Sequence, residues 1–201
     1  DAAPHSCRVI MQQRDMPIPV AMRETGQAVS IQSLILWSST SVVPEMSNAI
    51  AIPEGYKPQS PSTLAAYLSC IANVRDILGG VSSSWSIREV GDGNLNLVFI
   101  VKGPAGGIAV KQALPYVRLV GESWPLPLTR AHYEHMALSE QARLTGDLVP
   151  RVIHYDALQA LIVMELLEPH IIMRRGMIEA KVYPKFAGDM STFMARTLFF
   201  T

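Results

Sequence analysis

Gly91-Asp92-Gly93-Asn94-Leu95-Asn96 lies between two runs of residues that predict β-strands, 84–90 and 95–102. Side chains of the second run alternate between two faces, and the apolar face carries Leu97, Phe99 and Val101. Two glycines with Asp and Asn predict a tight turn, because glycine adopts a positive φ without steric penalty. Backbone N–H groups of such a turn can bind a phosphate, although a lone Gly-x-Gly is more often a plain β-hairpin.

A lysine follows this turn on the next predicted strand, 107–113. Ala109 and Lys111 share one face of that strand, whereas Ile108, Val110 and Gln112 share the other. A Lys placed after Ala and Val behind a glycine hairpin is the arrangement with which protein kinases hold the phosphates of ATP. The alternative is a lysine that protects an edge strand from aggregation.

Five blocks of sequence carry a resemblance to a known family. They resemble 5-methylthioribose kinase, and the last two resemble its plant-type branch. The blocks are Val90-Gly91-Asp92-Gly93-Asn94-Leu95-Asn96-Leu97-Val98-Phe99, Val110-Lys111-Gln112-Ala113-Leu114-Pro115-Tyr116-Val117-Arg118, Val120-Gly121-Glu122-Ser123-Trp124-Pro125-Leu126, Leu167-Glu168-Pro169-His170-Ile171-Ile172 and Arg175-Gly176-Met177-Ile178. The resemblance runs from about residue 61 to residue 201.

The resemblance implies an enzyme of methionine salvage that uses ATP and Mg²⁺ to phosphorylate the C1 hydroxyl of 5-methylthioribose. It also implies a homodimer as in the family, a Trp124 loop beside the active-site cleft, and adenine bound by backbone groups at 165–167. The residues that it assigns to ATP are Gly91, Gly93, Asn94, Asn96, Lys111, Glu134, Glu165, Leu166 and Leu167. At Leu166 the family often has Asp, a change that backbone recognition tolerates.

Two of these assignments have alternatives. Glu134 lies on a helix predicted over 130–144, capped by Thr129 and ended by Gly146. In a kinase Glu134 would pair with Lys111, whereas an ordinary helix would pair it with Arg130 four residues earlier. The ring of Trp124 could instead pack back onto the sheet.

The remaining pattern predicts an α+β fold, a kinase-like small lobe with a twisted antiparallel sheet of about five strands packed against the helix at 130–144. We expect a helix over 62–78, capped by Ser60 or Ser62, and two further strands, 149–155 and 160–165. Residues 114–128 and 168–181 are predicted to be irregular, and 184–200 a helix with a partly exposed apolar stripe. The predicted organisation is an upstream segment 1–45 outside the fold, a lobe 46–165, and a hinge with the start of a second lobe, 166–201.

Composition excludes several classes of protein. The 201 residues include 17 basic and 17 acidic ones, and this balance argues against a nucleic-acid partner. No apolar run approaches the ~18 residues of a membrane span. Cys7 and Cys70 fit neither a disulfide framework nor a metal motif, and they favour the cytoplasm. His132 and His135 lack the His-Glu-x-x-His pattern of zinc proteases and are expected to be solvated.

Two motifs of kinase-like enzymes do not occur in the 201 residues, a His-Gly-Asp loop and an Asp-x-Glu segment that holds Mg²⁺. We therefore expect this chain to be a fragment that is inactive alone, with metal ligands and substrate-holding residues beyond Thr201. Two alternatives remain: a choline or aminoglycoside kinase of the same fold, against which the block 121–125 argues, and a truncated, non-catalytic nucleotide-binding product.

Overall fold

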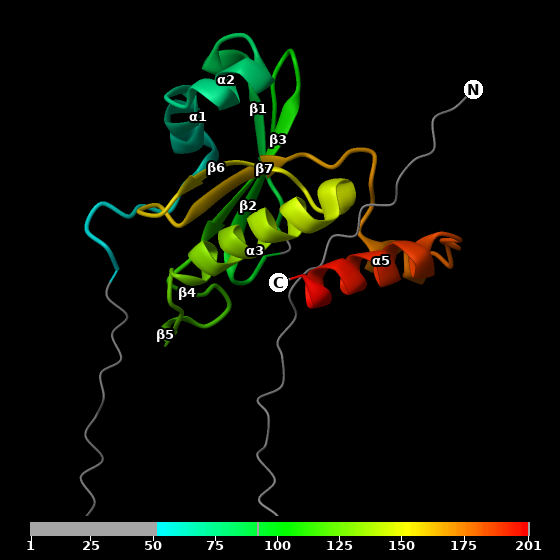
Figure 1. Ribbon diagram of the computed structural model, residues 1–201. Coiled ribbons are helices and arrows are strands. Elements are labelled where there is room, and N and C mark those ends of the chain that lie inside the picture. The colour runs from blue at the N-terminus through cyan, green and yellow to red at the C-terminus, as the bar shows by residue number, and fades with distance from the viewer. Residues whose placement is uncertain (1–51, 92, 201) are drawn as a thin grey trace, which may run out of the picture. The chain divides into compact units, whose positions relative to one another are not determined.

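The computed structural model of the chain describes residues 52–91 and 93–200. The predictions for residues 1–45 and for Asp92 lie outside the described residues. The described part is α+β, with a five-stranded antiparallel sheet in the order β1-β2-β3-β7-β6 (Figure 1). Its strands are β1 Ser86–Glu89, β2 Asn96–Lys102, β3 Gly107–Ala113, β6 Val152–Asp156 and β7 Leu161–Glu165. This confirms the predicted fold class.

The alternation of side chains predicted for the central strands is present. Leu97, Phe99 and Val101 of β2 are buried, as are Ile108 and Val110 of β3. The register pairs Val98 with Lys111, and Lys111 with Ile162 of β7, so these three residues share the opposite face of the sheet. Lys111 therefore stands in the middle of the sheet, which excludes its role as an edge-strand residue.

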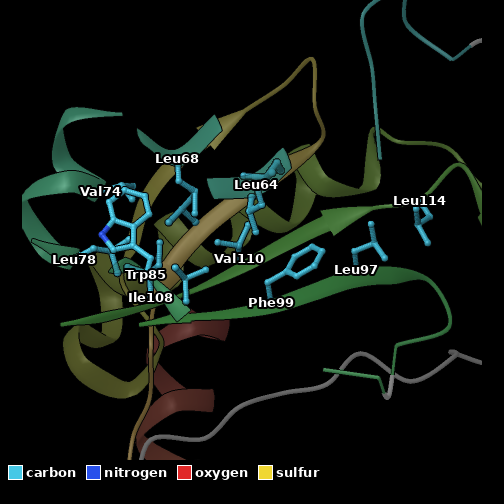
Figure 2. Packing of buried hydrophobic residues seen from close by; sticks show 13 residues of the cluster. Leu64, Leu68, Val74, Leu78, Trp85, Leu97, Phe99, Ile108, Val110 and Leu114 are labelled. Carbon is cyan, nitrogen blue, oxygen red and sulfur yellow. The ribbon is translucent and has the colours of Figure 1, made fainter. Parts of the chain in front are cut away.

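The main core lies between the sheet and two short helices, α1 Pro61–Ser69 and α2 Ala72–Leu78. Figure 2 shows the side chains of Leu64 and Leu68 directed at the sheet, where Val110 and Phe99 lie. The prediction of one helix over 62–78 is wrong, because Ile71 adopts an extended conformation that separates the two helices. Ser60 forms the predicted cap, and Gly79 ends α2 with a φ of 66°.

Helix α3 Arg130–Thr145 crosses the sheet on the face that carries Lys111 (Figure 1). Only Ala131 and Thr145 of this helix are buried, so α3 covers its face far less completely than α1 and α2 cover theirs. We predicted packing of the sheet against this helix, but the larger core is on the opposite side. Gly146 ends α3 as predicted, whereas the Thr129 side chain makes no cap hydrogen bond.

Two segments predicted to be irregular contain regular structure. Residues 114–128 include a small hairpin, β4 Tyr116–Val117 and β5 Gly121–Pro125, and residues 168–181 include α4 Met173–Ile178. Helix α5 Phe186–Phe199 follows as predicted. Its stripe is partly exposed, since Phe193 is buried whereas Leu198 is 72% exposed. No helix in the described part of the chain is long and apolar enough to cross a membrane.

A buried glutamine fixes the extended segment before α1. Gln112 on β3 is fully buried; its side-chain Oε1 accepts a hydrogen bond from the Gln59 N–H at 2.8 Å. Its Nε2 donates to the carbonyl oxygens of Lys57 and Gln159, each at 3.0 Å. This side chain satisfies three backbone groups from two segments, and a buried amide needs such partners.

Replacing Gln112 with Met keeps the volume of the side chain and removes all three hydrogen bonds. The backbone groups left without a hydrogen-bond partner should lower the free energy of unfolding by about 2–4 kcal/mol. Urea unfolding followed by circular dichroism measures the loss, with Gln141→Met on α3 as the matched control. A loss no larger than that of the control would show that the network contributes nothing to stability.

Candidate nucleotide site

The centre of the candidate site is an ion pair between the sheet and α3. The Nζ of Lys111 lies 2.6 Å from Oε1 of Glu134, and both side chains are only about a quarter exposed (27% and 28%). The predicted pair is therefore present, and the alternative pair of Glu134 with Arg130 is not formed. Glu134 occupies one of the three N–H donors of the ammonium, so the others can serve further acceptors.

The glycine turn joins β1 to β2 as predicted. Gly93 is required by space, because a Cβ there would lie 2.5 Å from the carbonyl oxygen of Asn96. The expected reason for glycine, a positive φ, holds at neither Gly91 nor Gly93, and a Cβ at Gly91 would meet no atom within 4 Å. The turn is anchored at its end, since the carbonyl oxygen of Asn94 accepts from the Arg118 N–H at 2.8 Å.

An apolar floor lies beside Lys111 on the same face of the sheet. The register places Val98 next to Lys111, and Ile100 and Met164 next to Ala109. These floor residues are partly exposed, unlike those of the opposite face. The sequence pattern places Ala109 and Lys111 on one face, but the contributions of β2 and β7 follow only from strand pairing. A flat apolar surface beside a lysine suits a planar base with an anionic tail.

The segment after β7 has backbone groups free for a ligand. The Glu165 N–H donates to the Arg151 carbonyl oxygen at 2.9 Å, and the Leu166 carbonyl accepts from the Glu168 N–H at 3.2 Å. For Leu167, no residue in 52–91 or 93–200 bonds its backbone N–H or C=O. The Leu166 side chain reaches Gly107, where an added Cβ would lie 2.7 Å from its Cδ2. The backbone at Leu167 can therefore hydrogen-bond the edge of a base.

Trp124 lies on β5, in the small hairpin that precedes α3. Its side chain is 60% exposed, so the ring does not pack back onto the sheet. Leu119 and Val120, between the two strands of the hairpin, are also exposed. An exposed tryptophan in an apolar loop is typical of a surface that binds a ligand or a partner.

One of the two histidines of α3, His135, differs from the prediction that both are solvated. His132 is exposed, but the ring of His135 stacks on Tyr155 of β6, with centroids 4.4 Å apart and planes at 12°. Burial lowers the pKa of His135 below its ordinary value of 6.5, and the neighbouring His132 lowers it further. The stack is one of the contacts that hold α3 on the sheet.

This lowered pKa predicts a pH dependence of stability. The folded chain favours the neutral form of His135 more than the unfolded chain does. The contribution of His135 to the free energy of unfolding is therefore complete above pH 6.5 and is lost as the pH falls below that value. His135→Phe keeps an aromatic stack and removes the titration. Urea unfolding at pH 7.5 and 5.5 should show a smaller loss in this variant than in the unmodified chain. An equal loss in the variant and in the unmodified chain would contradict this role.

The described residues do not include a metal centre. No group of three His, Cys, Asp or Glu side chains within 52–91 and 93–200 is placed to hold a metal ion. The carboxylate of Glu134 is committed to Lys111. The described residues therefore do not fit Mg²⁺.

Comparison with known proteins identifies relatives that match most of the chain. A methylthioribose kinase from Escherichia coli O45:K1 (strain S88 / ExPEC) is 48% identical over 152 residues, which are 75% of this chain and 36% of the relative. The chain is similar to methylthioribose kinases over three-quarters of its length. Methylthioribose kinases 2 and 1 of Oryza sativa subsp. japonica are both 46% identical over 149 residues, 74% of this chain and 35% of each relative. No protein-family model matches the chain.

The resemblance to methylthioribose kinase is thus confirmed, with bacterial and plant relatives at nearly the same identity. The chain spans about a third of the length of these methylthioribose kinases. These relatives are kinases, and a Lys–Glu ion pair between a strand and a helix is the arrangement with which kinases hold the lysine at the phosphates of ATP.

Proposed function

We propose that this chain supplies the nucleotide-binding lobe of a methylthioribose kinase, which transfers the γ-phosphoryl group of ATP to the C1 hydroxyl of 5-methylthioribose in methionine salvage. The observation that carries the proposal is the Lys111–Glu134 ion pair beside the apolar floor. Its placement in a chain 48% identical to a methylthioribose kinase supports this substrate over choline or an aminoglycoside.

In this proposal each element of the site binds a different part of ATP. The adenine rests on the apolar floor, and the backbone at Glu165, Leu166 and Leu167 bonds its edge. The phosphates lie between the glycine turn and Lys111, whose positive charge stabilises the charge that develops during transfer. Glu134 holds the ammonium in place. The residues that face the phosphates are Gly91, Gly93 and Asn94 of the turn and Asn96 at the start of β2.

Other parts of the proposal rest on the family resemblance. Residues 46–165 form the nucleotide lobe, and 166–201 form the hinge and the start of a second lobe. The Mg²⁺ that accompanies ATP is held outside the described residues, and the chain alone is inactive. The whole protein is a cytoplasmic homodimer, which sedimentation velocity of the full-length protein tests by its mass.

A chimera tests the nucleotide role, because the chain spans only part of its relatives. The chain replaces its matching stretch in the Escherichia coli methylthioribose kinase, and ATP-dependent phosphorylation of 5-methylthioribose is followed. We expect turnover, and Glu134→Gln should lower kcat/KM on the order of 10²-fold, since a displaced Lys111 misaligns the phosphates. The control is Glu140→Gln, an exposed residue of α3. A folded chimera without turnover, or equal effects of both variants, would contradict the proposal.

The same chimera tests the role of Trp124 toward the sugar. Trp124→Ala should raise the KM for 5-methylthioribose about tenfold and leave the KM for ATP unchanged, because the loss of one aromatic contact costs on the order of 1–2 kcal/mol. Leu119→Ala, at another exposed position of the same hairpin, is the control. Unchanged KM values in Trp124→Ala would remove this residue from the substrate site.

A further inference from the structure

Arg130 connects the first turn of α3 to the sheet. Its Nη2 donates to the carbonyl oxygen of Leu114 at 2.9 Å and also to the carbonyl oxygen of Leu95. These two residues are themselves joined, since the Leu114 N–H donates to the Leu95 carbonyl at 3.2 Å. A single guanidinium therefore binds the start of β2 and the end of β3 together.

The environment of Arg130 is unusual for an arginine. No carboxylate within the described residues accepts a hydrogen bond from its guanidinium, and its Nη1 is buried without any hydrogen-bond partner there. Burial lowers the pKa of Arg130, against the opposing effects of Tyr56 and Glu134. Arg130 is partly buried, so its desolvation costs free energy that no ion pair within the described residues offsets.

The three segments that Arg130 joins carry the glycine turn, Lys111 and Glu134, the parts of the proposed phosphate site. Leu95 directly follows the glycine turn, and Leu114 lies three residues after Lys111. Arg130 itself lies one helical turn before Glu134 on α3. A shift of α3 along the sheet would move Glu134 relative to Lys111 and the turn. The hydrogen bonds of Arg130 oppose such a shift, because they tie α3 to both strands.

We propose that Arg130 is a positioning residue of the nucleotide site, which clamps the base of the glycine turn and the end of β3 to α3. This inference rests on the proposed function for its kinetic consequence, but the clamp itself is a property of the chain without nucleotide. Arg130 acts through Glu134, Lys111 and the turn, and it does not touch ATP.

Hydrogen–deuterium exchange of the chain without nucleotide tests the clamp. In Arg130→Met, amides at 94–98 and 113–118 should exchange at least tenfold faster, because both segments lose their common partner. Amides in α1 should exchange at the same rate as in the unmodified chain, and this result would show that the variant folds. The matched control is Arg143→Met, since Arg143 is an exposed residue of α3 that pairs with Glu140. Unchanged exchange in Arg130→Met, or the same change in Arg143→Met, would overturn the clamp.

Kinetics of the chimera test the consequence for ATP. Arg130→Met should raise the KM for ATP about tenfold and leave the KM for 5-methylthioribose unchanged, and Arg130→Lys should restore part of the loss because an ammonium can still donate to carbonyl oxygens. A purely structural role would lower kcat through a smaller active fraction without changing the KM for ATP, which would overturn the proposal. If Lys111→Met leaves turnover intact, the proposed function fails, while the exchange result still decides the clamp.

Discussion

Lys111→Met in the chimera should lower the turnover of 5-methylthioribose on the order of 10²–10³-fold. This is the scale expected when one preorganised charge is removed from a transferred group, as for an oxyanion-hole donor. The effect should be large because Glu134 holds the ammonium at 2.6 Å and keeps it directed into the site. Steady-state kinetics with ATP and 5-methylthioribose as varied substrates measure it.

Two further variants make this prediction specific. Lys111→Arg should not restore turnover, because a forked guanidinium does not replace a compact ammonium in a site shaped for a point charge. Lys102→Met removes an exposed lysine of the neighbouring strand, which pairs with Glu168 at 2.9 Å, and should have little effect. Near-normal turnover in Lys111→Met would remove this lysine from the site and contradict the kinase function of β3.

Phe99→Ala should give the largest loss of stability, about 3–5 kcal/mol. Phe99 is fully buried in the cluster between the sheet and the helices α1 and α2, so its loss leaves a cavity that the closely packed neighbours cannot fill (Figure 2). Chemical denaturation of the purified chain measures the free energy of unfolding.

Ile100→Ala is the matched control, because Ile100 is the next residue of β2 and lies on the opposite, partly exposed face. Its loss should be clearly smaller, about 1 kcal/mol. Equal losses in the two variants would show that the main core is not on the side of α1 and α2.

Much of the site could be predicted because its signals are local. Alternation of apolar residues identifies β2 and β3, and glycine ends α2 and α3 at Gly79 and Gly146. Glu134 could be assigned to Lys111 because the helix follows the strands at the spacing of the family. The types and sequence positions of these two residues were enough to predict the ion pair.

The missed features depend on pairing or on weak local signals. Helix α2 begins at Ala72, and its N-cap Ile71 has no capping side chain, so no residue marks the break after Cys70. Strand β5 is mostly exposed and has no apolar alternation, and α4 has six residues, too few for a periodic signal. The roles of Gln112 and Arg130 come from backbone groups far away in sequence, which no sequence pattern indicates.

Labelling of lysines tests most directly whether Lys111 lies at the phosphates of ATP. An acyl-phosphate derivative of ATP acylates a lysine near the phosphates, and mass spectrometry identifies the modified residue. In the chimera, Lys111 should be labelled rapidly and excess ATP should protect it, whereas Lys102 and Lys181 should react slowly and without protection. Equal labelling of Lys111 with and without ATP, or ATP-protected labelling of other lysines alone, would contradict the assignment of this lobe as a nucleotide site.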